Sequence, residues 1–210
     1  MVKPPPKAKA MDGRRLRSMR MRQAIIDAYL ALLRESPQAP TAVQIAKRAG
    51  CSTRSVFERF EDLLSLSTAA ADHVFAQAHA LPVVRDHSAD RMVRLKSHVE
   101  TRAQICEQWL PMWRALVHNQ NESEILRTRI GYVYDMIRAR LRLMFGPELS
   151  AVSPAEQTHL LIALEALMDF EAWGRMRERH GLSVEDACAV WIDVIDRMMP
   201  PTPKEATDRA

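Results

Sequence analysis

Residues 41–60 read TAVQIAKRAGCSTRSVFERF, and this stretch decides the fold. Thr41 and Gln44 stand three positions apart at the head of an apolar run, which is the spacing of a capping box at a helix start. Gly50 is placed to end that helix as a left-handed cap, and Ser52 is placed to cap the next helix. Two short helices joined by a tight turn are typical of a helix-turn-helix unit.

The second helix of this unit is predicted over residues 53–60. In a helix-turn-helix the second helix enters the DNA major groove, with its N-terminal residues nearest the bases. Arg54 stands there among small polar residues, and its guanidinium can form two hydrogen bonds with one guanine. Val56, Phe57 and Phe60 are expected to anchor the helix to a core. Two short capped helices also occur in ordinary bundles, so this stretch alone leaves DNA binding open.

Charge is distributed unevenly along the 210 residues, whose net charge is +4. Residues 1–60 carry 13 Lys and Arg against 4 Asp and Glu, whereas residues 61–210 carry 17 against 22. A basic head on an acidic body favours a polyanionic partner for the head. A basic tail that serves only solubility is the alternative. A helix is predicted over 14–34, and its first half carries five arginines: Arg14, Arg15, Arg17, Arg20 and Arg22. Positive charge near a helix N-terminus is unfavourable because of the helix dipole. An anionic ligand at this place would explain why the arginines are there.

The rest of the composition predicts an all-α fold. Six glycines stand against 12 methionines, and no stretch alternates with the period of a strand. No apolar run approaches the roughly 20 residues of a membrane span, and the N-terminus lacks the apolar core of a secretory signal, so a cytoplasmic protein is expected. The odd, widely spaced cysteines and the spacing of the histidines predict no disulfide framework, no metal site and no cofactor.

Beyond residue 60 the pattern predicts one helix after another. The expected spans are about 61–79, 88–108, 111–118, 121–146, 154–180 and 183–199. The start at 154 is the clearest, because Ser153 caps it, Pro154 takes the first helical position and Glu156 the third.

Residues 14–64 resemble the N-terminal domain of TetR-family transcriptional regulators. The family pattern is an Arg before an apolar helix, a Thr-capped helix with Ile-Ala, a turn with Ala-Gly and Ser, an apolar–aromatic pair and a final Phe. The matching residues are Arg22, Ile25, Ile26, Thr41, Ile45, Ala46, Ala49, Gly50, Cys51, Ser52, Val56, Phe57 and Phe60. Three positions depart from the family: Phe57 replaces a Tyr, Leu63 replaces a Lys, and Arg59 stands where His or Tyr is usual. Arg59 is expected to replace a lost phosphate contact.

The resemblance implies an N-terminal helix-turn-helix three-helix domain and a larger C-terminal helical bundle for effector binding and dimerisation. The expected boundaries are a disordered tail over 1–13, a DNA-binding domain over 14–64, the helical domain over 65–199 and a disordered tail over 200–210. The implied function is sequence-specific transcription regulation, as a repressor released by a small, largely apolar effector, with a palindromic operator in double-stranded DNA. The DNA-binding candidates are Arg14, Arg15, Arg17, Thr41, Ser52, Thr53, Arg54, Ser55, Phe57 and Arg59.

An effector pocket, if present, is expected within residues 81–180. Aromatic and methionine side chains suit a large apolar ligand, with His98 and Arg102 placed to orient a polar end. A plain core role is the alternative for each residue. The candidates are His98, Arg102, Trp109, Met112, Trp113, Tyr132, Met136 and Met168.

The resemblance also implies a homodimer formed by the last two helices. Both are apolar over more than one stripe, which requires two neighbours. The alternative is that both faces lie in the core of one chain. The dimerisation candidates are Leu160, Leu164, Leu167, Trp191, Val194 and Met198.

Two other function classes compete with a regulator. An all-helical enzyme would need a catalytic constellation. Glu165 and Asp169 stand four residues apart on one helix face, as many structural acids do, and no recognisable catalytic pattern joins them. A helical adaptor could use the basic head on acidic proteins or membranes. The prediction is that the chain is not an enzyme.

Overall fold

The structure of the chain, a computed structural model, describes residues 8–36, 39–80 and 90–203. Within those ranges it holds helices and no strand, which confirms the all-α prediction. The α-helices are α1 (Ala8–Glu35), α2 (Ala42–Ala49), α3 (Thr53–Phe57), α4 (Leu63–Ala80), α5 (Arg91–Asn119), α6 (Glu124–Met144), α7 (Gly146–Leu149), α8 (Pro154–Leu167), α9 (Phe170–Gly174) and α10 (Val184–Met198). A 3₁₀ turn spans Gln120–Glu122 and a π-helical turn spans Arg175–Arg179.

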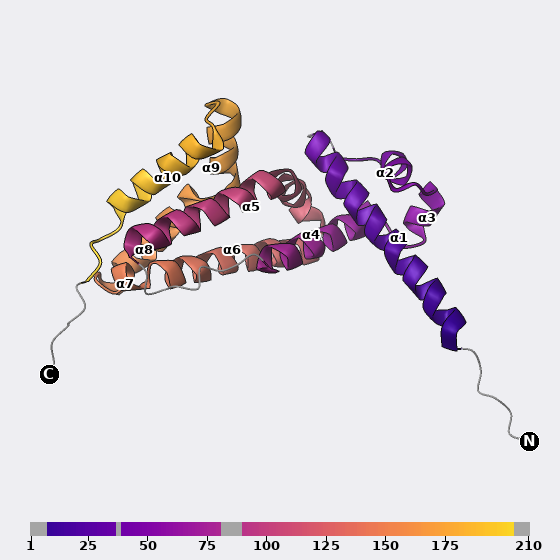
Figure 1. Ribbon diagram of the computed structural model, residues 1–210, viewed down its shortest axis with the longest axis horizontal. Helices are drawn as coiled ribbons and strands as arrows, with labels where there is room; N and C mark the ends of the chain where they lie inside the picture. The colour runs from indigo at the N-terminus through magenta and orange to yellow at the C-terminus, as the bar shows by residue number, and fades with distance from the viewer. Residues whose placement is uncertain (1–7, 37–38, 81–89, 204–210) are drawn as a thin grey trace, which may run out of the picture.

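The helices form two groups, with α1–α3 at one end of the molecule and α5–α10 at the other (Figure 1). Helix α4 runs from the first group into the second, packing against both α1 and α5. Helix α5 is the centre of the larger group and contacts α6, α9 and α10. Helix α1 also touches α5, so the two groups meet through two helices.

The predicted caps of the helix-turn-helix are present. The Thr41 hydroxyl accepts from the Gln44 amide at 3.3 Å, and Gln44 Oε1 accepts from the Thr41 amide at 2.8 Å. Gly50 has φ 68° and ψ 35°, the left-handed conformation that glycine adopts without a side-chain clash. Ser52 Oγ accepts from the Ser55 amide at 3.1 Å. These local bonds set the angle between α2 and α3.

The core beneath these two short helices is aliphatic and aromatic. Ile25 of α1, Ile45 of α2 and Val56 of α3 are 0% exposed, and Phe60 follows at 3%. The prediction that Phe57 anchors α3 is wrong, because its side chain is half exposed at 49%. One face of α3 is therefore held by the core, and the opposite face is free.

Two helices are longer than predicted. Helix α1 begins at Ala8, inside the segment 1–13 expected to be a disordered tail, while residues 1–7 lie outside the described ranges. Helix α5 continues through Pro111, where a break between 108 and 111 was expected. The lost hydrogen bond at Pro111 is offset by burial on both sides of it, since each flanking turn packs into the core. Those buried neighbours are Trp109, Leu110, Met112 and Trp113.

The prediction of a single helix over 154–180 is wrong, because the helix that begins at Pro154 ends at Leu167. Asp169 is extended, with ψ 154°, and its carboxylate accepts from the Glu171 amide to cap α9. The π-helical turn over 175–179 then follows α9. Glycine and proline are absent from 155–173, so the sequence carries no signal for this break.

Side chains from other helices satisfy the carbonyls that the break leaves free. Trp191 Nε1 of α10 donates to the Leu167 carbonyl at 3.0 Å. Arg102 Nε of α5 donates to the Met168 carbonyl at 2.9 Å. Buried carbonyls need such partners, so tertiary contacts stabilise the break where local propensity favours continuation.

The described ranges hold neither a candidate membrane span nor a candidate metal site. None of the helices there meets the length and apolarity that a bilayer crossing requires. No group of three or more His, Cys, Asp or Glu side chains there is placed to hold a metal ion.

Candidate nucleic-acid interface and ligand cavity

The N-terminal end of α3 is open to solvent. The Arg54 side chain is 88% exposed, and Thr53 beside it is exposed as well. Arg54 Nε lies 3.1 Å from Glu58 Oε1, one turn along the same helix. An exposed pair of this kind is worth under about 1 kcal/mol, so it does not hold Arg54 against a stronger anion.

Arg59 behaves differently from Arg54. Its Nη1 donates to the Ser55 carbonyl at 2.9 Å, and the side chain is 22% exposed. The guanidinium therefore lies along its own helix, where the sequence led us to expect a phosphate contact. Ser55 is itself half-buried.

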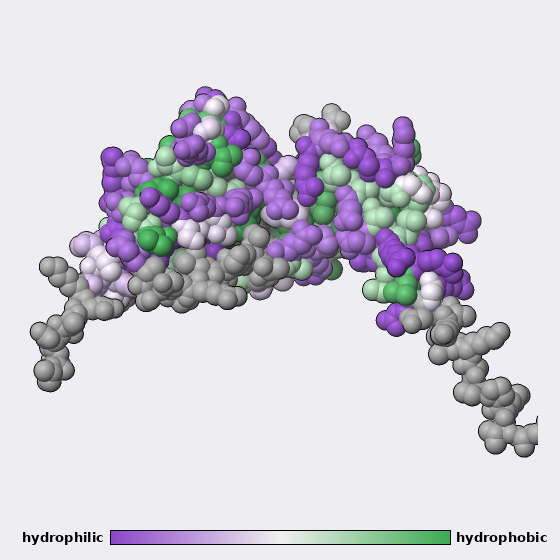
Figure 2. Space-filling view, in the orientation of Figure 1, coloured by the Kyte–Doolittle hydropathy of each residue, from purple (hydrophilic) through white to green (hydrophobic). Residues whose placement is uncertain are grey.

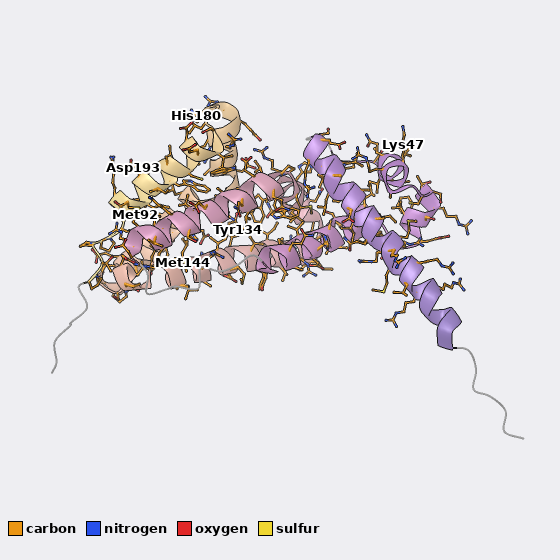
Figure 3. The ribbon with its side chains drawn as sticks, in the orientation of Figure 1. Lys47, Met92, Tyr134, Met144, His180 and Asp193 are labelled. Carbon is orange, nitrogen blue, oxygen red and sulfur yellow. The ribbon has the colours of Figure 1, made fainter. Side chains whose placement is uncertain are left out.

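Three other candidates lie along α1 and the remaining polar ones at helix starts. Arg14, Arg15 and Arg17 are exposed on the first turns of α1 after Gly13. Thr41 and Ser52 are exposed caps whose hydroxyls are used within α2 and α3. Side chains of α1, and Lys47 on α2, extend outward at this end of the molecule (Figure 3), and its edges are hydrophilic (Figure 2).

A cavity of about 320 Å³ lies within the larger group of helices. Its walls come from α4, α5, α6, α9 and the residue after α8. All eight residues predicted to line a pocket do line it: His98, Arg102, Trp109, Met112, Trp113, Tyr132, Met136 and Met168.

Sequence reasoning missed several lining residues, of which Arg140 has the most chemical consequence. It stands four residues after Met136 and eight after Tyr132, so it continues the same stripe of α6. That spacing is the signal that could have found it. The other missed residues are apolar or small, apart from Thr101: Val74, Phe75, Thr101, Ile105, Leu116, Val133, Ile137, Ala139, Leu143 and Phe170.

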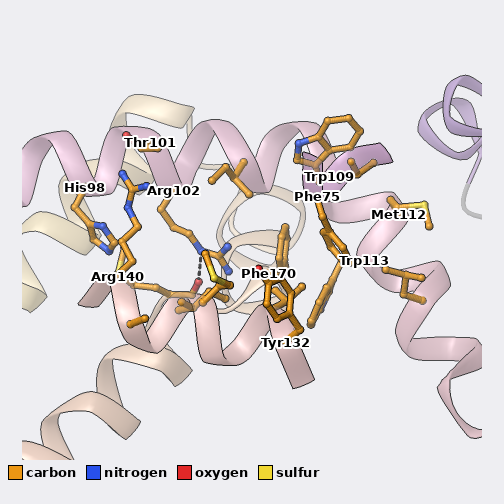
Figure 4. Close-up of a pocket in the computed structure, with 18 of the residues that line it drawn as sticks. Phe75, His98, Thr101, Arg102, Trp109, Met112, Trp113, Tyr132, Arg140 and Phe170 are labelled. Atoms are coloured by element: carbon orange, nitrogen blue, oxygen red, sulfur yellow. Dashed lines mark hydrogen bonds between the residues drawn. The ribbon is translucent and has the colours of Figure 1, made fainter. Parts of the chain in front are cut away.

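The lining is cationic at one end and aromatic at the other (Figure 4). His98, Arg102 and Arg140 gather at one end, and Trp109, Trp113 and Phe75 stand at the other. Trp113 stacks on Phe170, with 4.9 Å between ring centroids and 19° between planes.

Burial shifts the titration of the polar end. It lowers the pKa of His98 to about 3, and the positive charges of Arg140 and Arg102 add to the effect. Burial also lowers the pKa of Arg140, with repulsion from Arg102 as a second cause. His98 is therefore neutral at pH 7, and the two guanidinium groups carry the charge of this end.

Comparisons with known proteins bear on the fold. No family model matches the sequence, and no curated protein matches it. A solved structure from Rhodococcus sp., assigned to the TetR family of transcriptional regulators, superimposes with a TM-score of 0.61 at 19% identity, covering 86% of this chain and 99% of that one. The chain has the TetR fold. The fold implied by the resemblance of residues 14–64 is thereby confirmed.

Two further structures show the same TetR fold. A transcriptional regulator from Rhodococcus sp. Rha1 superimposes with a TM-score of 0.60 at 17% identity, covering 89% of this chain and 99% of that one. The multidrug binding protein EbrR, solved with imidazole, superimposes with a TM-score of 0.56 at 18% identity, covering 87% and 92%. Two of these three structures are thus of transcriptional regulators, and the third is of a multidrug binding protein.

Two of the dimerisation candidates in this TetR fold do not face outward. Leu164 and Trp191 are 0% exposed, so they belong to the core of the single chain and cannot touch a second copy. Ile162 of α8 and Val190 of α10, which the sequence reasoning passed over, are exposed instead. The other four candidates are partly exposed: Leu160, Leu167, Val194 and Met198.

The acidic pair considered for an enzyme has structural partners. Glu165 accepts from Arg138 at 2.8 Å, and Asp169 caps α9. Each carboxylate is explained by the contact it makes, and neither lines the cavity.

Proposed function

We propose that this chain is a sequence-specific DNA-binding transcription regulator, a repressor that a small effector releases from its operator. The observation that supports it best is the exposed, capped start of α3 carrying Arg54 on a basic helix-turn-helix. The DNA-binding unit is residues 14–64 and the effector and dimerisation domain residues 65–199. Such a regulator acts in the cytoplasm, without a cofactor.

The two sets of candidate DNA contacts have different roles. Arg54 reads a base, because a guanidinium can bond both O6 and N7 of guanine. Arg14, Arg15 and Arg17 bind phosphates, which fixes the position of the protein on the duplex without reading sequence. Because phosphate contacts release counterions, affinity falls steeply as salt rises. The remaining proposed contacts with DNA come from shorter side chains and one aromatic ring: Thr41, Ser52, Thr53, Ser55 and Phe57.

The regulator acts as a homodimer. A dimer of helix-turn-helix units places two recognition helices about 34 Å apart, one turn of DNA, and reads a palindrome. Exposed apolar side chains on α8 and α10, including Ile162 and Val190, supply the contact between copies.

Helix α4 connects the cavity to the DNA-binding unit. Val74 and Phe75 line the cavity, and His73 beside them lies 3.3 Å, Nε2 to Nε2, from Gln23 of α1. An effector that fits the cavity better when α4 is displaced shifts the population toward a dimer with the wrong spacing for DNA. The effector thus acts through its different affinity for two states.

Selection from a random duplex library at low salt tests this function. The expected result is an enriched palindromic motif whose binding weakens steeply as salt rises. Binding without any preferred sequence would instead support a basic adaptor, and would contradict the proposal.

A further inference from the structure

The polar end of the cavity holds the buried guanidinium of Arg102 and the half-buried guanidinium of Arg140, and no acid of the described residues pairs with either. Arg102 is 6% exposed, and its Nη2 has no hydrogen-bond partner within the described part of the chain. Arg140 Nη2 is likewise buried and unpartnered, as is Nδ1 of His98. Among the described residues that line the cavity there is no Asp or Glu. Burying unpaired charge is costly, so this arrangement is suited to a ligand that brings the opposite charge.

Two acids that lie close in the sequence to the lining residue Met168 are used elsewhere. Glu165 is paired with Arg138, whose side chain does not line the cavity. Asp169 accepts from the backbone of α9. These two carboxylates therefore do not neutralise Arg102 or Arg140.

Arg102 is held in place before any ligand arrives. Its Nε donates to the Met168 carbonyl, and its guanidinium lies over the Phe170 ring, with Cζ 4.3 Å from the centroid. These two contacts fix the plane of the guanidinium and leave Nη2 free. A fixed guanidinium loses little entropy on binding and forms bidentate bonds with a carboxylate.

The opposite end of the cavity selects the body of the ligand. Trp109, Met112 and Trp113 give it an apolar wall, with Phe75 facing them from α4 (Figure 4). A volume of about 320 Å³ is at the small end of the range for small-molecule sites, roughly 300–1,000 Å³. The body that fits is one compact aromatic system or a short alkyl chain.

We infer that the ligand of this cavity is an amphipathic organic anion, a carboxylate whose charged group lies between Arg102 and Arg140 and whose apolar body lies against the tryptophans. Neutral His98 adds a hydrogen bond to the carboxylate or to a neighbouring polar group. The sequence alone favoured a largely apolar effector, and the structure adds the negative charge. This inference rests on the proposed function only in treating the ligand as an effector.

Isothermal titration calorimetry with matched probes tests the inference on the full chain without DNA. The probes are naphthalene-2-carboxylate against naphthalene-2-carboxamide, and decanoate against decanamide, each up to about 1 mM, the limit of weak binding. At least one carboxylate is expected to bind about tenfold or more tightly than its amide, because bonds between charged groups exceed neutral ones by that much.

Variants assign that preference to the two arginines. Arg140→Gln and Arg102→Gln are each expected to lower carboxylate affinity about tenfold while leaving amide affinity unchanged. Arg138→Gln is the matched control, since it removes the same charge from the same helix outside the cavity, and it should keep the preference. Arg140 is half-buried, and its Nη2 has no hydrogen-bond partner among the described residues, so Arg140→Gln is expected to fold even where Arg102→Gln does not.

Three outcomes would overturn the inference. They are failure of every carboxylate to bind, equal affinity for acid and amide, or an unchanged preference in Arg140→Gln. Because these titrations contain no DNA, carboxylate binding by a chain without a preferred DNA site would overturn the proposed function and leave this inference standing. A preferred DNA site without preferential carboxylate binding would support the proposed function and contradict the inference of an anionic ligand.

Discussion

The guanidinium of Arg34 lies over the indole ring of Trp109, with Cζ 5.3 Å from the ring centroid. Arg34 belongs to the last turn of α1, and Trp109 lines the cavity. One side chain of the cavity wall therefore touches α1, which belongs to the proposed DNA-binding unit. We propose this contact as a second route, besides α4, by which an occupied cavity biases the position of α1.

Replacing Arg34 by Met is expected to weaken the coupling between ligand and DNA. The cation–π contact is worth about 0.5–2 kcal/mol, so the coupling free energy should fall by up to that amount. The measurement is the DNA dissociation constant with and without saturating naphthalene-2-carboxylate. Arg127→Met, in an exposed pair with Glu124 on α6, is the control. Equal coupling in both variants would show that Arg34 transmits nothing.

Acid should destabilise the fold through His98. The unfolded imidazole binds a proton as the pH falls below about 6.5, whereas burial keeps the folded imidazole neutral down to a pKa of about 3. Below about pH 6.5 the unfolded state binds more protons than the folded state, so the free energy of unfolding decreases as the pH is lowered. Linkage gives a loss of about 2 kcal/mol between pH 7 and pH 5.

Urea unfolding of His98→Gln at pH 7 and pH 5 checks this expectation. The variant should lose about 2 kcal/mol less than the wild type between the two pH values, whatever its absolute stability. His159→Gln, an exposed position on α8, should keep the wild-type slope. An unchanged slope in His98→Gln would mean that the folded imidazole titrates normally.

The turn between α2 and α3 should resist a side chain at Gly50. An added Cβ meets no atom within 4 Å, so the cost of Gly50→Ala is the left-handed backbone at φ 68°, about 1–2 kcal/mol. Gly131→Ala, in an exposed position of α6 that also has space, should stabilise the chain by about 0.5–1 kcal/mol. Thermal unfolding of both variants compares them directly, and a stabilised Gly50→Ala would refute the strain argument.

Local rules predict the helix-turn-helix well because local bonds build it. The caps at Thr41, Gly50 and Ser52 depend on residues three to five positions away, and each is present as expected. The cavity candidates were also found, since large aromatic and sulfur-bearing side chains gather where helices leave space.

Features set by distant residues escaped the sequence. The break after Leu167 depends on donors from Trp191 and Arg102 on other helices, and continuation through Pro111 depends on the burial of α5. Leu164 and Trp191 fit a dimer stripe by spacing alone, but tertiary packing buries both within one chain. Periodicity identifies an apolar face without saying what covers it.

The central claim is that α3 reads DNA sequence through Arg54. The most direct measurement is the affinity of Arg54→Ala for the selected duplex and for a scrambled one. Arg197→Ala is the matched control, because its exposed pair with Asp193 at the opposite end of the chain has the same spacing and similar exposure. Arg54→Ala should lose about 1–3 kcal/mol on the selected duplex only, with an unfolding free energy within about 0.5 kcal/mol of the wild type. Full retention of the preference for the selected duplex in Arg54→Ala would contradict the account.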